Sequence, residues 1–485
     1  MSIINKSISG MFWSLLQSVG GRFISFGVML LLARLLTPES FGLISLLTIF
    51  IQLSQALIVA GFNQALIQKK DTSDEDFSSV FWLNLLLSSL IYVILFLAAP
   101  LISEFYRQPL LTNLTRVLSL VFIINSFSYV QETRLVKNFL FKKIAIINIP
   151  SLIIGGTVSV LMALNDFGVW SIVAMQLVSR SVFVVQIWFI SKWKPLIVFN
   201  INKIKGLLSF GSKLIISEII HIIFENLYLI VIGKYFSLSS VGYYQNANNL
   251  VNTPSYTLSD AINKVFFSIF SSIQDDNEKI KKGFKNVMRL TLFLICPLFI
   301  FASVLAEPLF RYIFTEKWLP SVPYFQLLCI VGVFFPLNGF NLQILNIKGR
   351  SDLYLKLEII KKIITAVGVI IAIPFGIKAI IIFQVINSII SYFINSYYTG
   401  VFIHYPLSHQ ILDILPIFLL TLFCATAIFF ASHYLSPFND LSQIFLGLFI
   451  GVSLYVALAK FLKLDAYTEA SHLFRNHLLG YITKR

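Results

Sequence analysis

The chain has 485 residues, of which 57% are hydrophobic and only 12% are charged. A soluble fold of this composition would leave too much apolar surface in water, so a polytopic membrane protein is predicted. The net charge is +15, and most of the 37 lysines and arginines fall on alternate loops between apolar segments. This asymmetry is typical of cytoplasmic loops, so the basic charge reports membrane topology and argues against nucleic acid as a partner.

Fourteen membrane-spanning helices are predicted when each span is given about 20 apolar residues. The first six cover about 11–35, 41–66, 77–100, 116–134, 144–164 and 168–190. The next six cover about 210–232, 241–272, 287–306, 323–346, 354–373 and 378–400, and the last two cover about 410–432 and 441–460. The predicted fold class is all-α, with two pseudo-symmetric lobes of six helices and two C-terminal helices.

An internal repeat supports the two lobes. The segment from Ala33 to Leu43 recurs 200 positions later, from Gly233 to Tyr243, with a basic residue, a hydroxyl, a serine and a glycine at matching places. Internal repeats are typical of transporters whose substrate site lies between the repeats. The predicted parts are a first lobe over 1–200, a second lobe over 201–405, two further spans over 406–460 and a tail over 461–485. Both chain ends are predicted to be cytoplasmic.

The connector between the lobes is predicted to run from Ser191 to Ser209. It carries lysines between apolar residues, and Trp188 and Trp193 flank its start. Tryptophan is enriched where membrane meets water, so both rings are predicted to lie at the cytoplasmic interface.

Cationic side chains inside the predicted spans are the first binding-site candidates. A charge at the middle of a membrane costs at least ~2.5–3.5 kcal/mol on insertion scales, so such residues usually face a bundle interior or a water-filled cavity. Arg22, Arg180 and Lys264 fall in this class. Arg22 shares a helical stripe with Ser18 and Ser25, and it either faces a cavity or makes a structural hydrogen bond between helices.

Acidic and protonatable side chains form a second set in the seventh predicted span. Glu218, His221 and Glu225 are spaced by three and four residues, so they share one helical face. A carboxylate beside a histidine at that depth can exchange protons or bind a cation, which predicts a role in ion coupling or gating. The alternative is a permanent buried ion pair with Arg22 that fixes helix register.

Other polar residues in the spans are open to two interpretations. Asp260 and Lys264 lie one turn apart in the eighth span, where they either neutralise each other or contact a ligand or coupling ion. Amides recur in the eighth and tenth spans at Asn246, Asn248, Asn249, Asn252, Asn338, Asn341 and Asn346. Amides suit sugar hydroxyls, and they also bridge helices within membranes.

The sequence contains no recognisable catalytic constellation. It lacks a phosphate-binding glycine loop, a metal-spaced histidine pair and a nucleophile motif. The three cysteines lie in apolar runs, where packing explains them better than a disulfide or thiolate metal site. We therefore expect no enzyme activity, no cofactor and no metal.

Four segments carry a family resemblance: Ala33–Gly42, Ala65–Asp71, Phe81–Asn84 and Lys137–Lys143. They resemble loop and packing segments of the polysaccharide transporter family, the Wzx-type flippases of the multidrug/oligosaccharidyl-lipid/polysaccharide superfamily, and colanic-acid exporters look nearest. The resemblance covers the first lobe well and the second more loosely, up to about residue 400.

The resemblance implies a bundle that alternates between inward- and outward-open states in the bacterial inner membrane. Such a protein is expected to move a lipid-linked sugar unit, usually undecaprenyl-diphosphate-linked, to the outer leaflet for surface polysaccharide synthesis. Its expected partners are that lipid-linked oligosaccharide, the membrane lipids and the polysaccharide polymerase or export machinery. Cavity cations are expected to hold the diphosphate, a role that would fall here to Arg22, Arg180 and Lys264.

Two rival functions remain at the level of sequence. A cation-coupled multidrug exporter of the same superfamily would predict an acidic first-lobe cavity, whereas the charges in the first and sixth spans are positive. A membrane-bound glycosyltransferase or polymerase would need paired carboxylates on a sizeable outside loop, and the predicted outside loops are short and lack such a pair.

Overall fold

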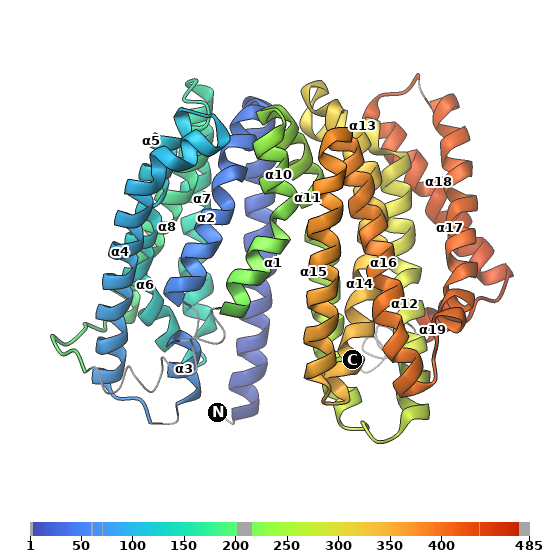
Figure 1. Cartoon of the computed structure of the whole chain (residues 1–485), viewed down its shortest axis with the longest axis horizontal. Coiled ribbons are helices and arrows are strands. Elements are labelled where there is room, and N and C mark those ends of the chain that lie inside the picture. The colour runs from blue at the N-terminus through green and yellow to red at the C-terminus, as the bar shows by residue number, and fades with distance from the viewer. Residues whose placement is uncertain (1–2, 60–61, 70, 201–215, 436, 475–485) are drawn as a thin grey trace, which may run out of the picture. The chain divides into compact units, whose positions relative to one another are not determined.

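A computed structural model of the chain describes residues 3–59, 62–69, 71–200, 216–435 and 437–474 (Figure 1). All regular elements in these ranges are helices, so the all-α prediction is confirmed. The chain divides into two compact units, Met1–Gly242 and Tyr243–Arg485. The predicted lobe and tail boundaries stay predictions.

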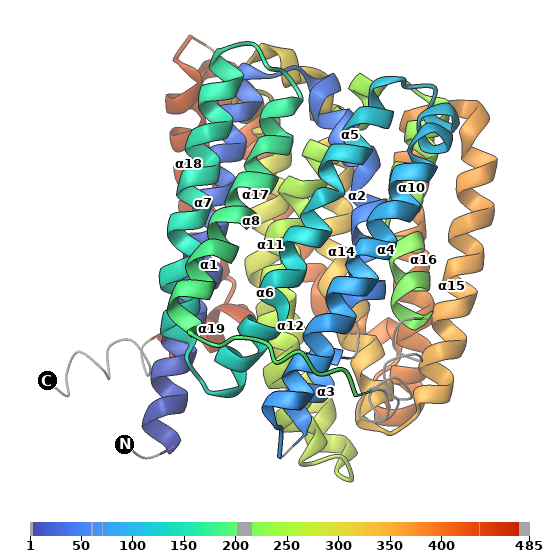
Figure 2. The ribbon, with the colours of Figure 1, turned by 90° about the vertical axis from the view of Figure 1, so that its left-hand side faces the viewer.

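In the first unit, α7 packs against both α1 and α8, and α6 packs against α4 and α8 (Figure 2). A short helix, Ile216–Glu225, meets α10 at a bend of 49°. The elements are α1 (Ile3–Leu35), α2 (Pro38–Val59), α3 (Phe62–Gln68), α4 (Asp74–Tyr106), α5 (Leu110–Leu118), α6 (Leu120–Lys137), α7 (Phe141–Leu164), α8 (Trp170–Ser191) and α10 (Leu227–Tyr235), and α11 (Leu238–Ser271) begins in this unit.

In the second unit, α14 packs against α16 and α12, and α17 packs against α12 and α18. The elements are α12 (Asn277–Val304), α13 (Ala306–Phe314), the 3-10 helix η1 (Glu316–Ser321), α14 (Val322–Ile347), α15 (Ser351–Ala372), η2 (Ile373–Phe375), α16 (Ile377–Ile403), α17 (Leu407–Leu435), α18 (Asp440–Phe461) and α19 (Asp465–Phe474).

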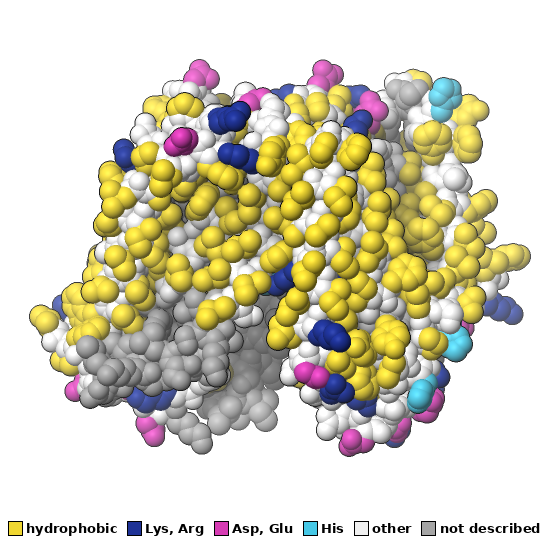
Figure 3. Space-filling model, viewed as in Figure 1, with side chains coloured by type: hydrophobic (Ala, Val, Ile, Leu, Met, Phe, Trp, Pro, Cys, Tyr) yellow, Lys and Arg dark blue, Asp and Glu magenta, His cyan; other side chains and the backbone are white. Residues whose placement is uncertain are grey.

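Eleven helices among the described residues are long and apolar enough to cross a membrane, or twelve if the bent pair Ile216–Glu225 and Leu227–Tyr235 is one span. Large apolar side chains cover the outside of α4, as lipid contact requires (Figure 3). The predicted eighth and eleventh spans correspond to α11 and α15. Both helices are long enough to cross a membrane, but their composition is too polar for them to be counted among the eleven candidate spans. The structure thus shows a multi-pass membrane protein, and the number fourteen stays a prediction.

The repeated segments of the sequence form one contact inside the first unit. Pro38 begins α2 and Leu238 begins α11. A Cβ atom on Gly42 would collide with the carbonyl group of Leu238, and one on Gly242 would collide with the carbonyl group of Pro38. The Ser239 hydroxyl donates a hydrogen bond to Glu39 beside this crossing. Only glycine lets the two helix starts approach so closely.

In each unit, a lysine at the end of one helix fixes the loop before another. Lys137, at the end of α6, donates from Nζ to the carbonyl oxygens of Leu66 and Lys69, at 2.9 and 2.6 Å, and to Thr72 Oγ1 at 2.8 Å. Lys348 follows α14 and donates to the Gln274 carbonyl and to Asn277 Oδ1, the latter at 2.6 Å. These charge-assisted bonds hold the loops that precede α4 and α12.

The connector after α8 lies along the start of α4, and the interfacial position of Trp188 and Trp193 stays a prediction. Trp193 is 8% exposed and packs with Leu66 and Phe81 in an apolar core. Its Nε1 donates to Asp74 Oδ1 at 3.2 Å, and Trp188 Nε1 donates to the Phe127 carbonyl at 2.9 Å. Trp193 therefore holds the connector to α4, and Trp188 holds α8 to α6.

Candidate functional site

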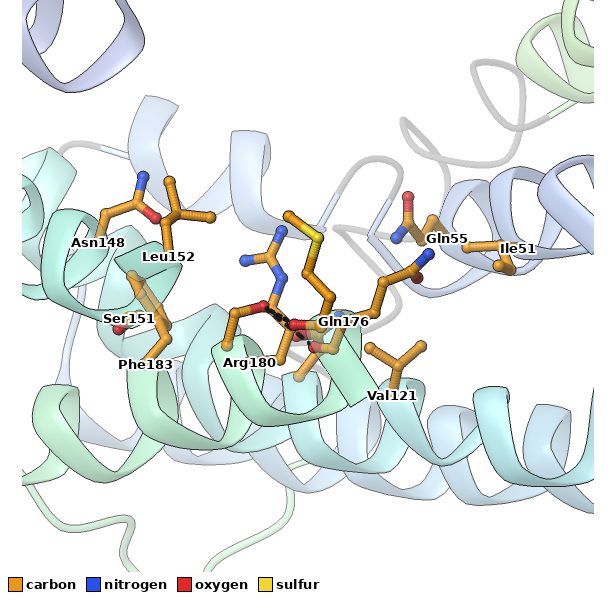
Figure 4. Close-up of a pocket in the computed structure, with 12 residues that line it drawn as sticks. Ile51, Gln55, Val121, Asn148, Ser151, Leu152, Gln176, Arg180 and Phe183 are labelled. Carbon is orange, nitrogen blue, oxygen red and sulfur yellow. Dashed lines mark hydrogen bonds between the residues drawn. The ribbon is translucent and has the colours of Figure 1, made fainter. Parts of the chain in front are cut away.

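The first unit contains a cavity of about 270 Å³ (Figure 4). Four helices, α2, α6, α7 and α8, supply its wall, and most of the polar side chains in the wall come from α7 and α8. The lining residues are Ile51 and Gln55 on α2, Val121 and Asn125 on α6, Asn148, Ser151 and Leu152 on α7, and Met175, Gln176, Ser179, Arg180 and Phe183 on α8.

The hydroxyl groups in this wall are satisfied by their own helices. Ser151 Oγ donates to the Ile147 carbonyl at 2.7 Å, and Ser179 Oγ donates to the Met175 carbonyl at 2.6 Å. Such back-bonding lets a serine sit in an apolar bundle at little cost. The amides of Gln55, Asn148 and Gln176 extend around the open space in Figure 4, where they are placed to bind a polar ligand.

Arg180 is the one charged residue among the twelve that line the cavity. Its side chain is exposed, and Figure 4 shows the guanidinium group reaching the open space near Gln176. A guanidinium group presents five donors in a fixed fork that matches carboxylate and phosphate oxygens. The cavity can therefore bind an anion with its charge and a hydroxyl-rich group with its amides.

A carboxylate and a phenol on α6 belong to the electrostatic surroundings of Arg180. Glu132 and Tyr129 both lie within electrostatic range of its guanidinium group. From sequence alone, no acidic side chain was predicted near Arg180, because Glu132 lies just before the basic residues at the end of the fourth predicted span. One signal in the sequence pointed to Glu132. It follows Tyr129 by three residues and so shares a face of α6, the helix that packs against α8.

The helices α7 and α8 approach each other closely beside the cavity. A Cβ atom on Gly155 would lie 2.6 Å from Ser179 Cβ and 2.9 Å from the Met175 carbonyl oxygen. Any larger residue would push α8 away, and Arg180 follows Ser179 on that helix. Gly155 thus contributes to where the guanidinium group lies.

Arg22 is exposed on α1 and is not among the residues that line the cavity. Its neighbour Gly21 faces α7, where a Cβ atom would meet Leu152 Cδ1 at 3.4 Å and Asn148 Nδ2 at 4.0 Å. Both of those residues line the cavity. The structure therefore brings the helix of Arg22, but not its side chain, to the cavity wall.

Glu218, His221 and Glu225 are all exposed on the short helix Ile216–Glu225. Ile222 of the same helix is buried with Ile49 and Ala56, so this helix packs against α2. None of the three polar residues lines the cavity around Arg180. The helix ends at Asn226, whose Nδ2 donates to Gln52 Oε1 at 2.7 Å.

The remaining two candidates are on α11. Asp260 and Lys264 belong to this helix, but their side chains lie outside the described residues. Their suggested mutual neutralisation and their roles toward a ligand stay predictions.

Two amides of the tenth predicted span, Asn338 and Asn341, bridge helices. Asn341 is fully buried, and its Oδ1 accepts hydrogen bonds from Gln410 Nε2 at 3.1 Å and Thr399 Oγ1 at 2.7 Å. Asn338 accepts from Asn395 Nδ2 at 2.9 Å. The structure thus favours the bridging interpretation for these two residues.

This amide network continues to a charged group at the start of α17. Tyr392 OH donates to Gln410 Oε1 at 3.0 Å, and Tyr405 OH donates to Asp413 Oδ2 at 2.5 Å. Burial raises the pKa of Tyr405, and the neighbouring Asp413 carboxylate raises it further. Lys285 and Arg289 of α12 form ion pairs with Asp413, so the network fastens α12 to α17.

Residues 31–323 match the model of the polysaccharide biosynthesis protein family. The chain belongs to this family. The matched range includes every residue that lines the cavity, and it confirms the family resemblance drawn from the four sequence segments.

Two relatives in this group carry informative names. The chain is 28% identical over 403 residues to the lipopolysaccharide biosynthesis protein WzxC of Escherichia coli (strain K12), which covers 81% of this chain and 82% of that protein. It is 29% identical over 329 residues to the succinoglycan biosynthesis transport protein ExoT of Rhizobium meliloti (strain 1021), which covers 68% and 67%.

A solved structure shares the fold. The lipid II flippase MurJ in an inward closed conformation superposes with a TM-score of 0.75, covering 93% of this chain and 98% of that chain at 15% sequence identity. At this identity the likeness shows the fold alone. It leaves the substrate to be argued from the site.

Proposed function

We propose that this protein is a flippase of the bacterial cytoplasmic membrane that moves lipid-linked oligosaccharide units, of the undecaprenyl-diphosphate type, for surface polysaccharide synthesis. The observation that carries the proposal is a cavity with an arginine as its one charged lining residue and amides around it, in a chain of the polysaccharide biosynthesis protein family. The names of ExoT and MurJ, a transport protein and a lipid flippase, support the same assignment.

In this proposal Arg180 holds the diphosphate. A guanidinium group binds two phosphate oxygens at once, and the amides of Gln176 and Asn148 bind sugar hydroxyls beside it. The polyprenyl chain stays in lipid, where the apolar outer surface of the helices provides its solvent. Arg22 and Lys264 complete the proposed set of cationic contacts during the passage of the headgroup.

Glu218, His221, Glu225 and Asp260 are proposed to couple transport to an ion gradient. The first three share an exposed face of one short helix, which ends at the 49° bend before α10. Protonation or cation binding there would change the charge of this face during each cycle. Both chain termini are placed in the cytoplasm by the distribution of basic loops, and the polymerase or export machinery would receive the product.

The rival function is a cation-coupled drug exporter, and Glu132 is the one observation in its favour. This carboxylate lies near the cavity, but Arg180 lies within its electrostatic range and reaches the open space itself. A cavity lined by the positive charge of Arg180, with Glu132 outside its lining, suits an anionic headgroup better than an organic cation. A glycosyltransferase or polymerase has no supporting observation among the described residues.

Transport by the purified full chain in liposomes tests the proposal. Movement of an undecaprenyl-diphosphate-linked oligosaccharide would be followed with and without an ion gradient, in wild type and in Arg180→Ala. Loss of a charge-assisted phosphate contact should slow transport roughly tenfold or more. Lys143→Ala, an exposed cation outside the cavity, is the matched control and should transport normally. A wild type that ignores this lipid but expels organic cations would reject the proposal.

A further inference from the structure

Three cations of the second unit lie on one side of α12, near its start. Lys285 and Arg289 are one helical turn apart, and Lys282 lies three residues before Lys285. Asp413 of α17 pairs with Lys285, at 2.9 Å, and with Arg289. This basic cluster of Lys282, Lys285 and Arg289 therefore has one carboxylate from a neighbouring span, and Asp413 alone leaves two positive charges in excess.

The basic cluster lies where the apolar surface of two helices begins. On α12, Leu294 and Leu298 are 62% and 46% exposed, and Leu294 follows Arg289 by five residues. On α17, Leu412 is 64% exposed and directly precedes Asp413. Figure 3 shows charged side chains gathered at the lower end of the second unit, below an apolar surface. Lipid headgroups occupy such a boundary between apolar and charged surface.

The helix α19 supplies the carboxylates that balance the basic cluster. It packs against α12 (Figure 1), and Arg289 Nη1 donates to Asp465 Oδ2 at 2.6 Å. Glu469 follows Asp465 by one helical turn. Burial raises the pKa of Glu469, and the nearby Arg289, Lys282 and Lys285 oppose this shift, so its carboxylate lies within electrostatic range of all three cations.

The contact between α19 and the basic cluster is a weak one. Asp465 is 68% exposed, and exposed ion pairs contribute little to stability. Glu469 Oε2 is buried and has no hydrogen-bond partner among the described residues, which is unfavourable for a polar atom. The ten residues of α19 are too few for a stable isolated helix in water, so its position depends on such contacts.

A phosphate group would fit the basic cluster better than these two carboxylates do. A guanidinium group binds two phosphate oxygens at once, and ammonium groups bind the remaining oxygens. At a membrane surface, each lysine or arginine also gains from the negative potential of anionic lipids. The charge, the depth and the weak cover together point to a lipid headgroup as the ligand.

We propose that the basic cluster binds the phosphate headgroup of an anionic phospholipid, and that α19 covers this site with Asp465 and Glu469 until the lipid displaces them. The lipid belongs to the leaflet at this end of the molecule, which is the cytoplasmic leaflet in the proposed orientation. The site lies in the second unit and serves a resident membrane lipid, so it is additional to the cavity around Arg180.

Cysteine labelling in nanodiscs tests the displacement of α19. Ala466 is 3% exposed, and the native cysteines are buried, so Ala466→Cys should react slowly with an uncharged maleimide in phosphatidylcholine. In phosphatidylglycerol the rate should rise at least fivefold, because the lipid takes the place of α19. Thr468→Cys, at an exposed position of the same helix, is the matched control and should react equally in both lipids.

Titration of the purified full chain with phosphatidylglycerol tests the charges themselves. Lys282→Gln should weaken binding about fivefold, whereas Asp465→Asn and Glu469→Gln remove competing carboxylates and should each tighten it by a similar factor. Lys279→Gln and Glu278→Gln, at exposed positions in the first turn of α12, are the controls and should bind as the wild type does. Thermal unfolding identifies any misfolded variant, and the exposed Lys282 and Asp465 keep the test decisive if Ala466→Cys is among them.

Several results would overturn the proposal. Equal labelling of Ala466→Cys in the two lipids would show that α19 is a fixed part of the structure. Weaker binding in Asp465→Asn, or an equal loss in Lys279→Gln and Lys282→Gln, would remove the site. Inorganic phosphate that raises the labelling in phosphatidylcholine as much as phosphatidylglycerol does would assign the cluster to a soluble anion, and undecaprenyl diphosphate with a larger effect than phosphatidylglycerol would assign it to the transported lipid.

Discussion

At the residue scale, two side chains from neighbouring helices set the charge of the first-unit cavity. Arg180 of α8 reaches into the open space, and Glu132 of α6 lies within electrostatic range of it. A carboxylate in this position attracts the guanidinium group and also competes with any anion that binds it. The affinity for a diphosphate is therefore expected to depend on both residues.

Glu132→Gln should tighten binding of undecaprenyl diphosphate by a factor of about five, since removal of a nearby opposite charge is worth on the order of 1 kcal/mol at a hydrated site. The measurement is a lipid-binding titration of the purified protein at constant ionic strength. Glu104→Gln, on the last turn of α4, should leave the affinity unchanged. Weaker binding in Glu132→Gln would instead assign Glu132 to cation recognition and would favour the exporter function.

The buried amide network of the second unit allows a stability prediction for one residue. Asn341→Leu would remove the acceptor that Thr399 Oγ1 and Gln410 Nε2 share, leaving Gln410 Nε2 only its bond to the Tyr405 carbonyl. Each lost partner of a buried polar group costs about 1–3 kcal/mol. The free energy of unfolding in detergent should fall by about 3 kcal/mol. Asn346→Leu is the control, because Asn346 bonds within its own helix to Gln343. Equal stability of the two variants would contradict the network's role.

At the element scale, the approach of α7 to α8 decides where the cavity wall lies. Gly155 faces the Ser179 backbone with no room for a side chain, so the two helices are closer there than other residues would allow. Small residues at such contacts are the usual means by which membrane helices pack without a hydrophobic driving force.

Gly155→Leu should lower the free energy of unfolding by about 1–3 kcal/mol through overpacking and should reduce transport by displacing Arg180. Gly20→Leu is the matched control, because a Cβ atom on Gly20 has no heavy atom within 4 Å and leucine favours the helix by about 0.5–1 kcal/mol over glycine. Thermal unfolding and liposome transport would be measured for both. A Gly155→Leu protein with unchanged stability and transport would show that α8 can move freely.

The sequence predicted the all-α class and drew attention to Arg180, because hydrophobic runs and an isolated charge within one are local patterns. It could not place Glu132, since this residue lies near a basic loop, where a charged residue is interpreted as solvated. It could not show that Trp193 packs in a core, because an indole ring suits a membrane interface and a packed core equally well. Such distinctions depend on which helices are neighbours, and that information is not local.

At the scale of the whole molecule, polarity and length give different numbers of membrane spans. The helices α11 and α15 have 34 and 22 residues, which is enough to cross a membrane, yet they carry too many polar groups to pass on composition. Helices of this kind occur in transporters because one side faces a path for substrate. Counted as spans together with the bent pair Ile216–Glu225 and Leu227–Tyr235, α11 and α15 would bring the total among the described residues to fourteen.

Cysteine labelling tests whether α15 crosses the membrane. Asp352 lies in the first turn of α15 and Lys378 lies beyond its last residue, and both positions are exposed. The native Cys296, Cys329 and Cys424 are buried, so background labelling should be low. A membrane-impermeant maleimide added to intact cells should label Lys378→Cys alone. Asp352→Cys should react only after the membrane is opened. Labelling of both from the same side would exclude α15 as a span.

The crossing of Gly42 with Gly242 has a consequence for the history of the chain. After a segment is duplicated, its two copies usually diverge independently, but here each copy must leave room for the other's helix start. A larger residue in either copy would be a defect in both, so substitutions at Gly42 and Gly242 are removed by the same contact. This mutual steric dependence explains why the two copies of the segment still carry the same residue at these positions. Gln52 and Asn226 also bond to each other, but they come from parts of the repeat that are not equivalent.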